Sequence, residues 1–209
     1  MVTLMPMFPL GSVLLPAMPL ALRVFEPRYL EMMAEVLRQE PAEFGVVLIE
    51  RGQEVGGGDQ RFGIGTVARI ADIEQGDGLI GLIARGTGRI EVVAWHDENP
   101  YPRAEVRELP DLVFDESSRA ALDDAELLVR TALSLASEFL ETMWSSDIEL
   151  ADDPVERVWQ LAGIAPVGVL DRLGFLRADT LDQLLVMLVA ETSSATEALR
   201  AGWATGTTD

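Results

Sequence analysis

Few side chains in this sequence could carry out covalent chemistry. Lysine and cysteine are absent, all 16 basic residues are arginines, and His96 is the one histidine. Arginine stays protonated and cannot act as a nucleophile, which excludes a phosphate-binding Walker A lysine, a serine–lysine dyad and a Schiff-base lysine. The lack of cysteine excludes disulfides, thiolate nucleophiles and thiolate metal sites. A single histidine cannot supply the paired imidazoles of an H-E-x-x-H zinc site either.

His96 is the residue on which a catalytic hypothesis depends. It lies beside Asp97 and Glu98, and a histidine next to carboxylates can act as a general base or as a single metal ligand. However, the sequence has no G-x-S-x-G motif that would supply a nucleophile. A small hydrolase using His96 with these carboxylates is therefore the alternative hypothesis. The main expectation is a protein with no catalytic residue, no metal and no cofactor.

Two glycine-rich segments resemble nucleotide-binding motifs. Residues 63–68 match G-x-G-x-x-A, but a dinucleotide site needs a helix directly after the glycines. Residues 66–73 are instead rich in β-branched side chains, which favour a strand. We interpret these glycines as a bend or bulge in a strand. The triplet at residues 56–58 lacks the lysine of a phosphate-binding loop and is interpreted as a loop tip.

The composition indicates a strongly acidic protein. The net charge is −19 from 35 acidic and 16 basic residues, and such a surface repels the phosphates of nucleic acids. Prolines interrupt the apolar start of the chain, so no export signal is recognised. The longest apolar run, residues 184–190, is too short to span a membrane. We expect a soluble cytoplasmic protein that binds neither nucleic acid nor membrane.

The first half of the chain has the pattern of short strands joined by tight turns. Residues 44–49 predict a strand buried on both faces, while residues 90–94 and 104–106 alternate as half-buried strands do. Residues 75–78, Gln-Gly-Asp-Gly, predict a hairpin turn.

One helix is expected among the strands. Pro27 suits a first helical turn, and Leu30, Met33 and Leu37 then recur on one face until Pro41 stops the segment. Several strands around one short helix indicate a small closed or nearly closed barrel, which leaves few unpaired edges.

The second half has the pattern of helices. Apolar residues at three-four spacing from Leu122 to Met143 predict one long helix. Asp153-Pro154-Val155-Glu156 predicts the start of a second helix, a third is expected near Pro166, and the capping box Thr180-Leu181-Asp182-Gln183 predicts the start of the last one.

Methionines and aromatic residues are concentrated near the start of the chain. They are Met5, Met7, Phe8, Met18, Phe25, Tyr29, Met32 and Met33. Methionine adapts its shape to its neighbours, so an exposed cluster of this kind could bind varied apolar peptides. The same residues could equally fill the core of the barrel. Both interpretations remain open at this point.

Several motifs of the first half occur with the order and spacing of one known family. The most specific is Phe25-Glu26-Pro27-Arg28-Tyr29. The others are Met7-Phe8-Pro9-Leu10, Val13-Leu14-Leu15-Pro16, Gly86-Thr87-Gly88-Arg89-Ile90 and Tyr101-Pro102-Arg103-Ala104-Glu105-Val106. Through these motifs residues 4–108 resemble the N-terminal (substrate-binding) domain of Lon proteases, while the helical half is similar mainly in pattern.

This resemblance implies a fold and a function. The implied fold is α+β, with a PUA-like β-pseudobarrel containing one short helix at residues 1–112 and an α-helical bundle at residues 113–209. Full Lon proteases recognise unfolded or tagged proteins with this region, which precedes an ATPase and a serine–lysine peptidase. Both are missing from this sequence. The resemblance therefore implies a free-standing, non-catalytic protein- or peptide-binding module of protein quality control, with a protease or chaperone as its partner.

The candidate binding residues combine the apolar cluster with one charged pair. They are Met7, Phe8, Phe25, Glu26, Arg28, Tyr29, Met32 and Met33. Glu26 and Arg28 also have a structural interpretation, in which the pair locks the helix start to the barrel. RNA binding is a further hypothesis, because PUA-like barrels of other families bind RNA, although the acidity argues against it. Self-association through the apolar faces of the helical half is also expected.

Overall fold

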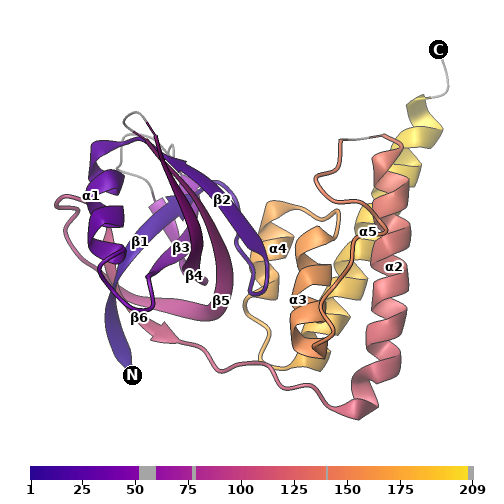
Figure 1. Cartoon of the computed structure of the whole chain (residues 1–209). Coiled ribbons are helices and arrows are strands. Elements are labelled where there is room, and N and C mark those ends of the chain that lie inside the picture. The colour runs from indigo at the N-terminus through magenta and orange to yellow at the C-terminus, as the bar shows by residue number, and fades with distance from the viewer. Residues whose placement is uncertain (52–59, 77–78, 140, 207–209) are drawn as a thin grey trace. The chain divides into compact units, whose positions relative to one another are not determined.

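The computed structural model divides into two compact units, one rich in strands and one helical (Figure 1). The units are Met1–Asp111 and Leu112–Asp209. The structure describes residues 1–51, 60–76, 79–139 and 141–206. The glycine triplet at 56–58 and the centre of the predicted hairpin turn, residues 77–78, lie outside the described residues. Among the described helices, none is long and apolar enough to cross a membrane.

Within the described residues, the first unit contains six strands and helix α1. In chain order they are β1 (Val2–Leu10), β2 (Pro19–Val24), α1 (Pro27–Val36), β3 (Glu43–Arg51), β4 (Gln60–Gly76), β5 (Leu79–Trp95) and β6 (Arg103–Glu108). The sheet order is β2-β5-β4-β3-β1-β6, and β5 also pairs with β6. β1 and β3 are parallel, whereas the other pairs are antiparallel. The β5–β6 pairing closes five strands into a ring, in agreement with the predicted small barrel.

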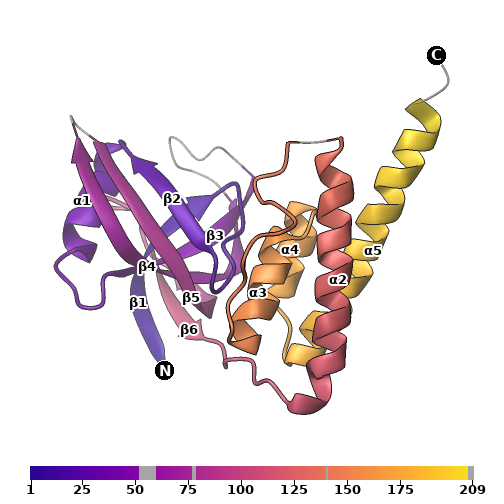
Figure 2. The ribbon, with the colours of Figure 1, turned by 45° about the vertical axis from the view of Figure 1, so that its right-hand side comes forward.

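Strand β5 is long enough to pair with two neighbours in succession. Residues 80–85 pair with β2, and residues 90–95 pair with β6. Between these segments lies Gly86, where a Cβ atom would be 2.2 Å from the carbonyl oxygen of Leu15. Only a residue without a side chain allows the backbones to approach this closely. β2 is therefore attached to the barrel through the first half of β5 alone (Figure 2).

The barrel core is made of apolar side chains from five strands. One cluster in it consists of Met7, Val47, Val67, Ile90, Ala104 and Val106. Residues 44–48 of β3 are all buried, which confirms the strand buried on both faces. The alternation predicted for residues 90–94 places Ala94 on the buried face, which is wrong. The register shifts between Val92 and Ala94, and the end of β5 is exposed.

The G-x-G-x-x-A motif lies inside strand β4. A Cβ atom at Gly65 would be 2.1 Å from the carbonyl oxygen of Val46, so this glycine permits a close approach of β3 and β4. The interpretation as a strand motif is confirmed, because β4 continues directly from these glycines to Gly76.

Helix α1 packs on the barrel with a different face from the predicted one. Its buried residues are Tyr29, Met32, Met33 and Val36, whereas Leu30 and Leu37 are half-buried. The ring of Tyr29 stacks on Phe8 of β1 with 4.2 Å between the centroids. This contact rotates the helix so that Tyr29 points inward. The helix also ends at Val36, earlier than the stop predicted at Pro41.

A tight turn leads the chain into β2. The amide of Met18 donates to the carbonyl of Leu15 (3.3 Å), and Ala17 between them has a φ of 61°. Pro16 at the second position and a positive φ at the third are the features of a type II turn. Ala17 then donates to the carbonyl of Gly86 (2.8 Å), and the Gly86 amide donates to the carbonyl of Met18 (2.9 Å). These bonds fix the register of β2 on β5.

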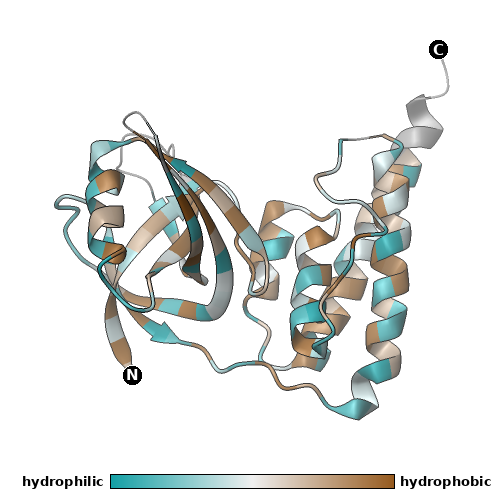
Figure 3. Ribbon diagram, viewed as in Figure 1, coloured by the Kyte–Doolittle hydropathy of each residue, from teal (hydrophilic) through white to brown (hydrophobic). Residues whose placement is uncertain are grey.

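The second unit contains, among its described residues, a 3₁₀ turn and four helices. They are η1 (Glu116–Ser118), α2 (Arg119–Ser137), α3 (Pro154–Ile164), α4 (Val169–Phe175) and α5 (Leu181–Gly206). The predicted starts of two helices are confirmed, because Asp153 accepts from the amide of Glu156 (2.9 Å) and Thr180 from the amide of Gln183 (3.1 Å). Apolar and polar residues alternate along these helices (Figure 3), and the apolar side of α2 packs mainly on α5.

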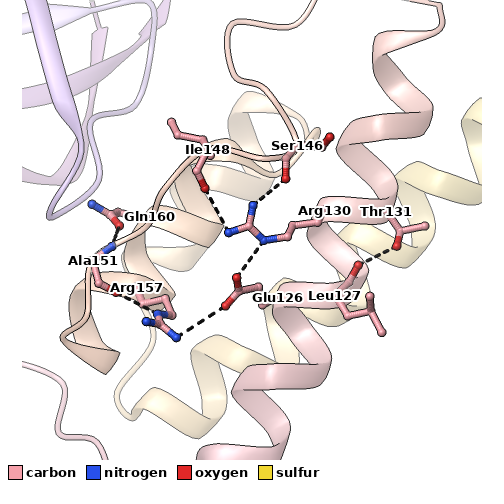
Figure 4. Close-up of polar contacts among 9 residues, drawn as sticks. All are labelled: Glu126, Leu127, Arg130, Thr131, Ser146, Ile148, Ala151, Arg157 and Gln160. Carbon is pink, nitrogen blue, oxygen red and sulfur yellow. Dashed lines mark hydrogen bonds and ion pairs between the residues drawn. The ribbon is translucent and has the colours of Figure 1, made fainter.

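Helix α2 is shorter than predicted, because it ends at Ser137 and leaves Met143 exposed. The chain then turns back along the helix, where Arg130 holds it (Figure 4). The Arg130 guanidinium donates to the carbonyls of Ser146 (2.6 Å) and Ile148 (3.1 Å) and to the carboxylate of Glu126 (2.8 Å). Residues after Ser137 thus continue the helical apolar spacing without being helical.

Candidate binding site

The segment between β2 and α1 presents one aromatic residue to solvent. β2 ends at Val24, and Phe25 follows with 59% of its surface exposed. Glu26 is the N-cap residue of α1, and its backbone carbonyl accepts from the amides of Tyr29 and Leu30, both at 3.0 Å. Pro27 occupies the first helical turn, where the lack of an N–H costs nothing. The helix start therefore holds Phe25 in place at the end of β2.

Arg28 connects this helix start to the chain that follows β5. Its Nε donates to Glu26 at 3.1 Å, and its Nη1 lies 3.6 Å from Oε2 of Glu98. The guanidinium also lies over the ring of Tyr29, 4.5 Å from the centroid. Among the described residues none accepts a hydrogen bond from the buried Nη2 of Arg28. This nitrogen is itself shielded from solvent, so a molecule at the surface does not reach it where the side chain now lies.

Glu98 joins Arg28 to a second arginine and a second aromatic residue. Arg61 of β4 donates from Nη2 to Glu98 at 2.5 Å, and only 6% of its side chain is exposed. Its guanidinium lies over the ring of Trp95, 4.7 Å from the centroid. Trp95, at the end of β5, is 36% exposed. A continuous chain of contacts thus runs from Glu26 to Trp95 and includes acidic and basic groups in alternation.

The predicted binding residues separate into a buried and an exposed group. The buried ones are Met7, Phe8, Tyr29, Met32 and Met33. Their side chains fill the barrel and the base of α1, which is the core-packing interpretation. Phe25 is exposed, and Glu26 and Arg28 are half-buried. The structure therefore brings Phe25, Glu26 and Arg28 together at the surface, whereas the five buried residues are not part of that surface.

Sequence reasoning missed the contribution of Arg61 and Trp95. Trp95 lies at the end of a strand whose alternation predicts exposure at odd positions, so its position carried a usable signal. Arg61 carried none, because it is one arginine among 16 and its contact with Glu98 spans 37 residues.

The histidine of the alternative hypothesis has a different partner from the expected ones. Nε2 of His96 lies 3.2 Å from Oε1 of Glu105, and 45% of the histidine side chain is exposed. Glu98, one of the two carboxylates expected beside it, is paired with Arg61 and Arg28 instead. Within residues 1–51, 60–76, 79–139 and 141–206, no three acidic or histidine side chains are grouped so that they could hold a metal ion.

A second polar cluster attaches α1 to strand β6. Tyr101 is buried, and its hydroxyl donates to the carboxylate of Glu35. Arg103 donates to Glu35 at 2.9 Å and to the Tyr101 hydroxyl at 2.6 Å. Burial, followed by the hydrogen bond to Glu35, raises the pKa of Tyr101. We assign this cluster a structural role, because its groups bind one another across two elements.

Comparison with known proteins identifies a family that matches most of the chain. The sequence pattern of the family described as the ATP-dependent protease La (LON) substrate-binding domain matches residues 4–192. The Lon protease of Anaeromyxobacter dehalogenans (strain 2CP-C) is 29% identical over 144 residues, which are 66% of this chain and 16% of that protein. The chain thus spans about a sixth of the length of this curated relative.

Solved structures show the same fold. A Lon N-terminal domain protein from Xanthomonas campestris superposes with a TM-score of 0.64 at 28% identity, covering 90% of this chain and 98% of that one. The N-terminal domain of a Mycobacterium avium complex Lon protease superposes with a TM-score of 0.63 at 16% identity, covering 91% and 98%. At 16% identity, the likeness to the Mycobacterium avium complex domain concerns the fold alone.

Proposed function

The chain belongs to the family of Lon (ATP-dependent protease La) substrate-binding domains, and from this membership we propose that it binds segments of other proteins without catalysing a reaction on them. The observation that carries the proposal is the exposed Phe25 beside the Glu26–Arg28 pair. An exposed aromatic ring next to a pair of charged side chains suits a polypeptide, which offers apolar and polar groups together. The lack of lysine and cysteine supports a non-catalytic role.

The proposed ligands are unfolded or tagged protein segments. Their apolar side chains would cover the exposed ring of Phe25. The buried methionines and Tyr29 would act indirectly, by holding this surface in place. The net charge of −19 favours segments with basic residues and disfavours RNA. A protease or a chaperone is the proposed partner that would act on the bound segment.

We further propose that the two units are domains, a PUA-like barrel and a helical bundle, with the boundary near residue 112. The closed ring of β1, β3, β4, β5 and β6 supports the first assignment. The packing of α2 on α5 supports the second.

Titration of an unfolded protein against its folded form tests the binding function. The probe is fluorescently labelled ribonuclease A, a basic protein, either native or reduced and alkylated so that it stays unfolded. We expect the anisotropy of the unfolded probe to rise with a dissociation constant of about 10 µM, and that of the native probe to stay constant. Absence of binding to the unfolded probe at several times that concentration refutes the proposal.

The same samples test for the absence of catalysis. After prolonged incubation with the protein, the mass of the unfolded probe should be unchanged. Cleavage that disappears in the His96→Ala variant would instead establish the hydrolase hypothesis.

A further inference from the structure

Strand β2, which leads directly to Phe25, is paired along one edge. Its six residues pair with β5, from Pro19 opposite Arg85 to Val24 opposite Ile80. Every other strand of the first unit has partners on both edges. In the described part of the chain, no strand pairs with the outer edge of β2. The outer edge of β2 is therefore open, although the ring of the other five strands is closed, and an open edge can pair with another chain.

The register identifies the backbone groups that face outward. The Gly86 amide donates to the carbonyl of Met18, and hydrogen-bonded positions alternate along an antiparallel pair. The even-numbered residues 20, 22 and 24 therefore bond to β5. Pro19, Ala21 and Arg23 direct their backbone groups to the outer edge. Pro19 has no N–H, which suits a position without a ladder bond, so Ala21 and Arg23 supply the outward donors.

A groove on the sheet face formed by β2, β5 and β4, on the inner side of β2, has apolar and acidic walls. Its volume is about 450 Å³, and its lining residues are Ala21, Leu22, Arg23, Asp72, Ile73, Glu74, Gly81, Leu82 and Ile83. Ile83, opposite Ala21, is 50% exposed. Gly81, opposite Arg23, leaves a depression because it has no side chain. Asp72 and Glu74 pair with Ile83 and Gly81 on the far side, so two carboxylates face one arginine across an apolar floor.

We propose that an extended segment of a bound protein adds to the outer edge of β2 as an extra strand, and that this segment carries basic residues. The inference rests on the proposed function and specifies the chemistry of the ligand. Backbone hydrogen bonds at Ala21 and Arg23 supply affinity independently of sequence, as in other cases of strand addition. The segment then continues to Phe25, which follows β2 directly.

Charge decides between a substrate segment and a second copy of this chain as the occupant. Two copies would each carry a net charge of −19, and like charges oppose pairing. A segment with basic residues is attracted by the same charge and by the carboxylates of the groove. The occupant we propose is therefore an extended apolar and basic segment of another protein.

Amide hydrogen exchange followed by NMR on the full chain tests the inference. The probe is again reduced and alkylated ribonuclease A. When it is bound, exchange at the amides of Ala21 and Arg23 should slow by about tenfold or more, whereas Leu22, already bonded to β5, should change little. Binding of the probe with unchanged exchange at Ala21 and Arg23 overturns the inference and leaves the proposed function intact. Failure of the probe to bind overturns both.

A matched pair of substitutions at one position gives an independent test. Ala21→Pro removes the outward N–H without removing a bond to β5, while Ala21→Ser keeps the N–H and a small side chain. We expect about a tenfold weaker affinity for Ala21→Pro and an affinity near that of the native chain for Ala21→Ser. Equal affinities in two variants with native-like spectra contradict strand addition. Should Ala21→Pro fail to fold, the exchange experiment decides alone. Protection of the Ala21 amide that grows with protein concentration, without the probe, would identify a second copy as the occupant and overturn our choice.

Discussion

Replacement of Phe25 by alanine tests the surface at which binding is proposed. Fully burying a phenylalanine side chain contributes about 1.5–3 kcal/mol. Since 59% of Phe25 is exposed in the free protein, covering it with a ligand is worth about 1–2 kcal/mol on the same scale. Phe25→Ala should therefore raise the dissociation constant of the unfolded probe by about 5- to 30-fold.

The matched control is Leu170→Ala in helix α4. Leu170 has a similar exposed fraction, 62%, but lies in the other unit. Both substitutions affect mainly exposed surface, so each should change the free energy of unfolding by less than about 1 kcal/mol. The assay is the anisotropy titration, with circular dichroism and thermal unfolding to verify that both variants fold. The reasoning is refuted if Phe25→Ala binds as tightly as the native chain, or if Leu170→Ala weakens binding equally.

Two further predictions concern stability. Ala17→Gly should raise the free energy of unfolding by about 1 kcal/mol, because Ala17 has a φ of 61° that glycine adopts without strain. Thermal unfolding measures this change. The control is Ala94→Gly, at a strand position without a positive φ, which should lower the free energy of unfolding. Tyr101→Phe should lower the free energy of unfolding by about 1–2 kcal/mol at neutral pH, since the hydroxyl bonded to Glu35 is lost. Because the folded-state pKa of Tyr101 is raised from its usual value of 10.0, the unfolded chain ionises first, and native stability falls as pH rises above that value. Denaturant unfolding should therefore show the gap between the native chain and Tyr101→Phe narrowing above pH 10.0, and a constant gap would contradict this assignment.

Local patterns in the sequence predicted much of the fold. The start of α3 at Asp153 and that of α5 at Thr180 depend on a side chain and an amide three residues away, so the sequence contains the whole motif. The buried β3 is likewise a local apolar run. The family followed from short motifs such as residues 25–29, and the comparisons confirm it.

Contacts between distant residues limited the remaining predictions. The rotation of α1 depends on the stacking of Tyr29 on Phe8. The spacing of apolar residues within the helix carries no information about Phe8, which lies on β1. The end of α2 depends on Arg130 binding carbonyls of residues 146 and 148. In the candidate site, Arg28 and Glu98 meet across 70 residues of sequence only because β5 returns beside the helix start. Such pairings are decided by topology rather than by local pattern.

The position of β1 affects how the barrel can assemble during translation. β1 lies between β3 and β6, and Val2 pairs with Arg107. A nascent chain therefore holds its first strand half-paired until β6 has left the ribosome. Pairings this distant in sequence are formed slowly, because a long loop must be ordered before they contribute. Until β6 arrives, the unfinished barrel thus has further unpaired edges at β1 and at the end of β5, and pairing with β6 removes both.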